Sequence, residues 1–135
     1  MINVYLIRNV GLDTSSPDSP RGFMATNSCT FHGSAAYPYI YMAGFAVEKT
    51  GRTSVSYRLG LFPLLDPGAR VCVDLVHGHQ WDDPQVNMVE EVARVTGHSV
   101  HVLVNPVTKE KVEISEEWRD KLRPLAPLAA QVKTS

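Results

Sequence analysis

The fold is decided by residues 44–62, which read Gly44-Phe-Ala-Val-Glu-Lys-Thr-Gly-Arg-Thr-Ser-Val-Ser-Tyr-Arg-Leu-Gly-Leu-Phe62. Apolar and polar side chains alternate on both sides of Thr50-Gly51-Arg52, which is the period of β-strands. We therefore expect strands over about 39–49 and 53–62. Because so short a connection separates them, the two strands must form an antiparallel hairpin.

Similar alternation predicts further strands over 23–31, over 95–104 and, more weakly, over 71–75. In the first of these the residues expected to share one face are Phe23, Ala25, Asn27, Cys29 and Phe31.

Two helical segments flank the expected strands. Residues 2–10 have a helical period but no capping residue before them. Ser115, followed by Glu116 and Glu117, predicts the start of a short helix with Trp118 and Leu122 on its apolar side. The fold class is therefore α+β. We expect one domain over 1–123 and a flexible tail over 124–135.

The composition restricts the class of protein. The 135 residues are 44% hydrophobic and 20% charged, which is typical of a globular domain and excludes a disordered chain. Thirteen basic and fourteen acidic side chains give a net charge of −1, which argues against nucleic acid or a membrane as partner. Two cysteines, Cys29 and Cys72, are too few for a disulfide framework and are expected to be reduced core residues. With no signal peptide in view, we expect a soluble cytoplasmic protein.

Most residue patterns that could support catalysis or metal binding are weak in this sequence. His77 and His79 share a strand face, but Asp74 has the opposite parity and no further ligand is near, so we expect no metal site. His98 and His101 are three apart in a strand and are expected on opposite faces. No nucleophile elbow, phosphate-binding loop or dinucleotide fingerprint is present, so we expect no redox cofactor.

The connection of the hairpin carries the strongest cluster. Lys49, Arg52 and Ser54 bring two cations and a hydroxyl to the backbone N–H groups near Gly51, a combination that can hold phosphates. On the residues alone, a solvated turn is the favoured interpretation.

The same stretch resembles the central hairpin of hotdog-fold acyl-CoA thioesterases of the 4-hydroxybenzoyl-CoA thioesterase-like group. Those proteins carry a line V-x-[KR]-x-G-[RN]-[ST]-S-[VF]-x-Y, which residues 47–57 match. Further resemblance follows in the family's order at residues 3–13, 27–38 and 97–112 and around Trp118.

The resemblance implies a curved antiparallel sheet around a central helix and homodimers with continuous sheets. It implies hydrolysis of an acyl-CoA thioester without a cofactor, with the active site between subunits. It also implies that CoA contacts the positions Lys49, Gly51, Arg52, Thr53 and Ser54.

The sequence departs from the family in two places. The family's Asp-x-x-Gly-His-x-Asn-Asn line, which supplies the catalytic carboxylate, is not found, and we expect it upstream of Met1 together with a first strand. Residues 63–94 form a longer segment than compact members of the family need.

Because residues 2–10 hold only two helical turns, we expect the concave face of the sheet to expose Val55, Tyr57 and Val102 and to favour self-association.

Three hypotheses therefore stand. The chain is an acyl-CoA thioesterase lacking its N-terminal part, a non-catalytic hotdog module for acyl-CoA binding or dimerisation, or an unrelated β-rich binder of small molecules.

Overall fold

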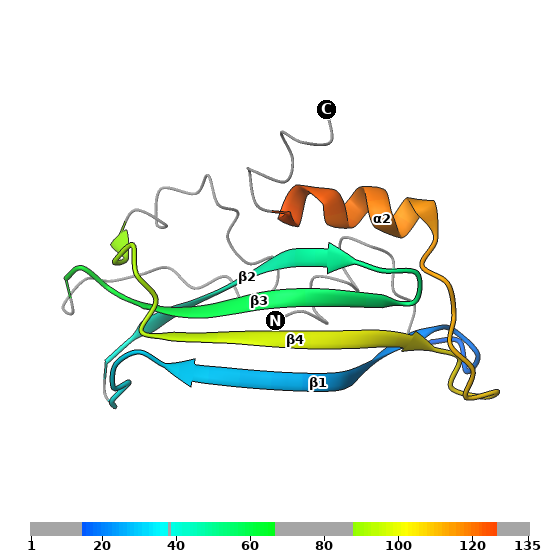
Figure 1. The fold of residues 1–135 in the computed structure, drawn as a ribbon, viewed down its shortest axis with the longest axis horizontal. Coiled ribbons are helices and arrows are strands. Elements are labelled where there is room, and N and C mark those ends of the chain that lie inside the picture. Colours follow the sequence, from blue (N-terminus) through cyan, green and yellow to red (C-terminus); the bar gives the residue numbers. More distant parts are fainter. Residues whose placement is uncertain (1–14, 38, 67–87, 127–135) are drawn as a thin grey trace.

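An antiparallel sheet with a short helix on one face forms the described part of the chain (Figure 1). The computed structural model describes residues 15–37, 39–66 and 88–126. Its elements are, in order, β1 (Arg21–Phe31), β2 (Tyr41–Thr50), β3 (Ser54–Pro63), β4 (Val95–Val104), α2 (Glu116–Leu122) and the 3-10 helix η3 (Arg123–Leu125). The sheet has four strands in the order β1-β4-β3-β2, so β1 and β2 are its edges. The α+β fold class is confirmed.

The predicted hairpin is β2 and β3. Phe45 lies opposite Leu59 and Thr50 opposite Val55, with a register shift between Val47 and Lys49. β4 then pairs with β3 on one side and β1 on the other. The hairpin places the two strand ends that carry the phosphate-binding candidates side by side.

The core lies on one face of the sheet, called here the inner face. Val55 and Tyr57 are only 2% and 1% exposed, and they pack with Val47, Leu103, Ile114 and Leu122. The expectation that Val55 and Tyr57 are exposed is therefore wrong, because α2 and the segment before it contribute Leu122 and Ile114 to this face. Val102 lies opposite Ser54 and so belongs to the other, outer face.

β1 departs from the predicted face assignment. Its register with β4 shifts between Met24 and Thr26. The shift turns Phe23 to the outer face while Asn27, Cys29 and Phe31 stay on the inner face. Cys29 is exposed, so its assignment to the core is also wrong. The alternation of apolar and polar residues does not reveal a bulge. One extra residue in the strand reverses the predicted face of every residue beyond it.

The helix α2 begins where the sequence predicts. The Ser115 hydroxyl accepts a hydrogen bond from the Trp118 N–H at 3.3 Å, and Glu116 and Glu117 occupy the first turn. Leu122 is buried as the last residue of α2. Within the described residues, no helix is long and apolar enough to cross a membrane.

The ends of the long 63–94 segment pair with each other. Leu64 and Val89 form an isolated antiparallel bridge, and the Glu90 N–H donates to the Pro63 carbonyl at 2.9 Å. The predicted helix over 2–10, the strand over 71–75, Cys72 and the histidines 77 and 79 lie outside the described residues.

Candidate functional site

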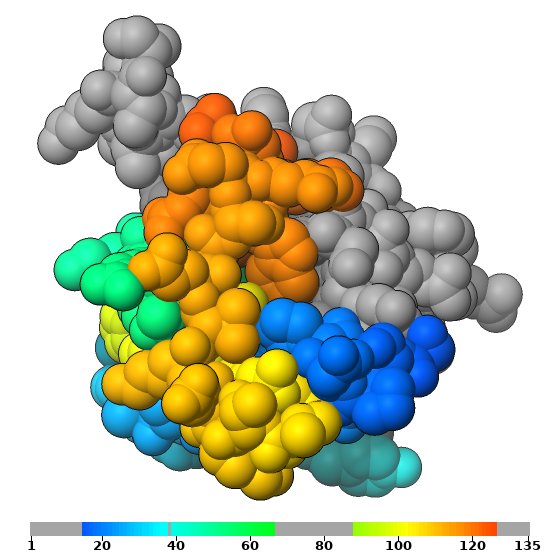
Figure 2. Space-filling view, turned by 90° about the vertical axis from the view of Figure 1, so that its right-hand side faces the viewer, coloured from blue at the N-terminus to red at the C-terminus, as the bar shows by residue number. Residues whose placement is uncertain are grey.

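The five residues expected to contact CoA meet at one end of the sheet. Lys49 is the penultimate residue of β2, Gly51 to Thr53 form the connection, and Ser54 begins β3. Figure 2 shows this end of the molecule, where the turn lies against the segment that leads into α2. The structure therefore brings the whole predicted cluster together.

All three carbonyls of the connection face other parts of the chain. Gly51 O accepts from the Arg119 guanidinium at 2.9 Å. Arg52 O accepts from the Ile114 N–H at 2.9 Å, and Thr53 O from the Leu103 N–H at 2.8 Å. These bonds hold the turn in one orientation and keep its carbonyl oxygens away from an incoming anion.

The N–H groups of the connection are less engaged. The Gly51 N–H donates to Ser54 O at 2.8 Å and closes the turn. The N–H groups of Arg52 and Thr53 make no hydrogen bond to any residue that the structure describes. Unengaged backbone N–H groups in a turn can donate to a phosphate oxygen. A β-carbon on Gly51 would lie 3.0 Å from the Ser54 hydroxyl oxygen, so a larger residue would crowd that hydroxyl.

Arg52 forms an ion pair at the surface. Its Nε lies 2.6 Å from Glu113 Oε1, and the two side chains are 81% and 65% exposed. An ion pair this exposed contributes little to stability, because water and salt screen both charges. The guanidinium of Arg52 can therefore exchange Glu113 for a phosphate at small cost.

Two further cations lie at the turn, beside Arg52. Lys49 is exposed and forms no ion pair with a described residue, and Arg119 adds a cation whose Nε lies 3.7 Å from Glu116. Sequence reasoning missed Glu113 and Arg119, because both reach the turn from more than sixty residues away along the chain. No local signal reports such a contact.

A second polar group lies on the inner face, in β4. Ser99 and His101 are buried, and the Ser99 hydroxyl oxygen and both ring nitrogens of His101 have no hydrogen-bond partner among the residues that the structure describes. The His101 ring meets the Tyr57 ring edge-on at 5.1 Å between centroids. Burial lowers the pKa of His101, and burial raises the pKa of Tyr57 to about 12. The group is thus uncharged at neutral pH.

The predicted opposition of His98 and His101 is confirmed. His98 is exposed on the outer face, with its Nδ1 3.1 Å from Glu48 Oε2, whereas His101 is buried on the inner face. Within the described ranges, His, Cys, Asp and Glu form no group of three that could hold a metal ion. The candidates Asp74, His77 and His79 lie outside those ranges.

No protein-family model matches the chain, and no curated protein matches it. Solved structures do match. The PA5185 protein of Pseudomonas aeruginosa PAO1 is 28% identical with a TM-score of 0.67, over 94% of this chain and 71% of that one. A thioesterase-superfamily protein of Jannaschia sp. CCS1 is 18% identical with a TM-score of 0.63, over 90% of this chain and 62% of that one.

A predicted thioesterase of Bacillus stearothermophilus is 16% identical with a TM-score of 0.62, over 93% of this chain and 73% of that one. The chain thus spans less than two thirds of the Jannaschia protein that it resembles. The antiparallel sheet and its short helix match these structures over nearly all of the chain. The chain has the hotdog fold of thioesterase-superfamily proteins.

Proposed function

We propose that the chain acts on acyl-CoA thioesters, in the reaction R–CO–S–CoA + H2O → R–COOH + CoA-SH. The observation that carries the proposal is the anchored turn between β2 and β3. It combines the side chains of Lys49 and Arg52 with two unengaged backbone N–H groups, in a fold found in thioesterases.

The turn fits the phosphates of CoA in charge and in donor geometry. Arginine and backbone N–H groups form short, charge-assisted hydrogen bonds to phosphate oxygens. The carbonyls of the turn are taken by Arg119, Ile114 and Leu103, so they do not oppose the anion. In this proposal the turn anchors the nucleotide part of the substrate, and the thioester extends away from it.

The chemical step follows the resemblance to the family. There, backbone N–H groups at a helix N-terminus polarise the thioester carbonyl and a carboxylate activates water or attacks directly. Both devices are physically sound, because a helix N-terminus is a preformed oxyanion site and a carboxylate can act as base or nucleophile. The Asp-x-x-Gly-His-x-Asn-Asn line that supplies them in the family is not in this sequence.

A second candidate is a hotdog module that binds acyl-CoA without hydrolysing it, which the same turn supports. The two candidates share the turn and differ in the chemical step. A third expectation, also from the resemblance, is a homodimer with continuous sheets, which the exposed edge strand β1 supports.

Hydrolysis kinetics test the proposal. The full chain is assayed for release of the CoA thiol from an acyl-CoA and from the pantetheine thioester of the same acid. We expect a lower KM for the CoA ester. We expect Arg52→Ala to raise that KM about tenfold with little change in kcat, since the contact is made equally in ground and transition states.

Arg58→Ala is the matched control, because Arg58 is an exposed arginine on the outer face in β3. If Arg52→Ala hydrolyses the CoA ester with an unchanged KM, the turn does not take part in substrate binding. CoA binding without thiol release would leave the binding module as the function. Neither binding nor release would refute both candidates.

A further inference from the structure

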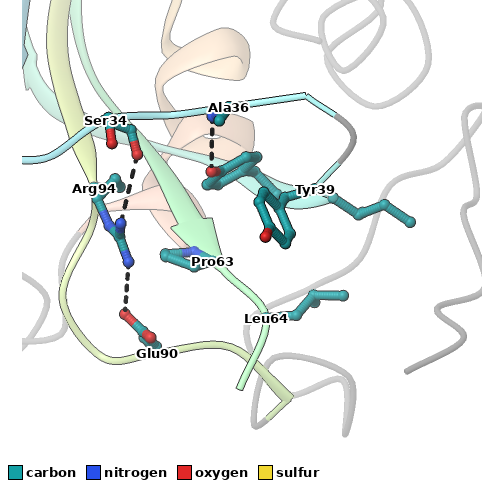
Figure 3. A pocket seen from close by; sticks show the side chains of 9 residues that line it. Ser34, Ala36, Tyr39, Pro63, Leu64, Glu90 and Arg94 are labelled. Atoms are coloured by element: carbon teal, nitrogen blue, oxygen red, sulfur yellow. Dashed lines mark hydrogen bonds and ion pairs between the residues drawn. The ribbon is translucent and has the colours of Figure 1, made fainter. Parts of the chain in front are cut away.

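A pocket lies at the end of the sheet opposite to the β2–β3 turn. It has a volume of about 330 Å³, within the range of small-molecule sites. Its walls come from the β1–β2 connection, the start of β2, the end of β3 and the segment before β4 (Figure 3). Strands of ten residues separate it from the turn by roughly 30 Å. It is therefore a separate site from the one proposed above.

Arg94 provides the charge in this pocket, and its backbone is fixed on two sides. Its N–H donates to Leu61 O at 2.8 Å, and its carbonyl accepts from the N–H groups of His32 at 2.9 Å and Gly33 at 3.2 Å. Its side chain passes over Gly33, where a β-carbon would clash with Arg94 Cδ in this conformation. The Arg94 side chain lines the pocket.

Among the residues that the structure describes, the guanidinium has weak partners for a group with five N–H donors. Its Nη1 lies 3.5 Å from Ser34 O, and its Nη2 lies 3.8 Å from Glu90 Oε2. Figure 3 shows Arg94 between Ser34 and Glu90. Both distances exceed the 2.7–2.9 Å of a charge-assisted hydrogen bond, so a better placed acceptor can compete for the same donors.

The remaining walls are aromatic and apolar. Tyr39 and Tyr41 lie on one side, and Ile40, Pro63 and Leu64 contribute apolar surface. The Tyr41 hydroxyl accepts from the Ala36 N–H at 3.1 Å, which fixes that ring. This described lining suits a ligand with a compact apolar or aromatic body and an acceptor group at one end.

We propose that this pocket binds a small carboxylic acid. The carboxylate forms two parallel hydrogen bonds with Arg94 and displaces Glu90, while the apolar body of the acid packs against Tyr39 and Leu64. A monoanion suits the site better than a phosphate dianion, because one guanidinium must offset the ligand beside the carboxylate of Glu90. The proposal does not rest on thioester hydrolysis and stands if the chain neither binds nor hydrolyses acyl-CoA.

The test measures the affinity of the full chain for benzoate by NMR titration. Benzamide, which has the same shape without the charge, and inorganic phosphate are the comparison ligands. We expect benzoate to bind at least about tenfold more tightly than benzamide, since only benzoate pairs with the guanidinium. Affinities are read from the resonances of the pocket residues, because the β2–β3 turn is itself proposed to bind phosphate. Equal affinities of the pocket for benzoate and benzamide, or tighter binding of phosphate in the pocket, would overturn the proposal.

Two variants at the pocket are expected to change benzoate binding in opposite directions. Arg94→Gln should abolish the preference for benzoate over benzamide. Glu90→Gln should raise benzoate affinity about threefold, because it removes the competing carboxylate. Arg58→Gln, at an exposed arginine outside the pocket, should leave benzoate binding unchanged. If Arg94→Gln does not fold, weaker benzoate binding in Glu90→Gln still contradicts the proposal.

Discussion

His101 is a buried imidazole, and neither ring nitrogen is hydrogen-bonded to a described part of the chain. Burial lowers its pKa below the ordinary 6.5, so the unfolded chain takes up a proton more readily than the folded protein does. His101 therefore contributes no pH dependence to the stability above about pH 6.5, and stability falls as the pH drops from there towards the folded-state pKa.

We therefore expect His101→Leu to reduce the loss of stability between about pH 6.5 and pH 5. At about pH 7.5 the same change should raise the free energy of unfolding by about 1 kcal/mol, because it removes buried polar atoms without partners. Thermal unfolding at several pH values measures both effects. Ser99→Ala is the control, since it alters the same buried group without a titrating side chain. A pH dependence that is unchanged in His101→Leu would contradict this account.

Glu113 competes with a phosphate for Arg52 at the β2–β3 turn. If the turn binds CoA, Glu113→Gln should tighten CoA binding about threefold by removing the competing charge. Glu110→Gln is a matched control, because Glu110 is an exposed acid, whereas the acid that pairs with Arg52 is Glu113. Calorimetry compares the two variants. Weaker binding in Glu113→Gln would show that Glu113 supports the site rather than competes for it.

At the scale of elements, β1 is an edge strand with a bulge. Phe23, Met24 and Phe31 are 50%, 59% and 72% exposed, and β1 pairs only with β4 among the described strands. A long strand with exposed apolar residues and one open edge favours pairing with another strand. This is the physical basis of the proposed homodimer.

We expect Met24→Lys to weaken self-association, because two like charges would approach each other where the edges pair. Light scattering over a range of concentrations measures the mass. Val92→Lys is the control, since Val92 is 75% exposed and lies outside β1. A wild-type protein that stays monomeric at high concentration, or a dimer equally stable in Met24→Lys, would refute β1 as the interface.

The elements that the sequence predicts correctly are those with local signals. The hairpin follows from two alternating runs and the short turn at Gly51, and α2 follows from Ser115 and the two acids after it. The bulge in β1 has no such signal. Alternation therefore places Phe23 on the same face as Cys29, whereas in the structure the two residues lie on opposite faces. The burial of Val55 and Tyr57 also depends on distant Ile114 and Leu122, which periodicity cannot pair with them.

In the candidate site, too, residues close in the sequence are predictable and contacts between distant segments are not. Lys49, Gly51, Arg52, Thr53 and Ser54 are close in sequence, so one short motif was enough to find them. Glu113 and Arg119 reach the turn only after β4 and α2 have packed, and the Arg94 pocket joins three separate segments. Such contacts are set by topology rather than by local pattern.

At the scale of the whole molecule, the long β2–β3 hairpin separates two sites. The turn at one end offers cations and N–H groups, and the pocket at the other offers Arg94 with apolar walls. Because the strands between them pair residue by residue into the buried core, the hairpin holds both ends in fixed positions. Binding at one end is therefore measurable without disturbing the other.

The central claim is that the β2–β3 turn binds the phosphates of CoA. Calorimetric titration of CoA into the full chain at low salt, repeated with Arg52→Ala and Arg58→Ala, tests it most directly. We predict saturable binding that weakens about tenfold in Arg52→Ala and is unchanged in Arg58→Ala. Absence of CoA binding by the folded wild-type protein, or equal affinity in all three proteins, would contradict the claim.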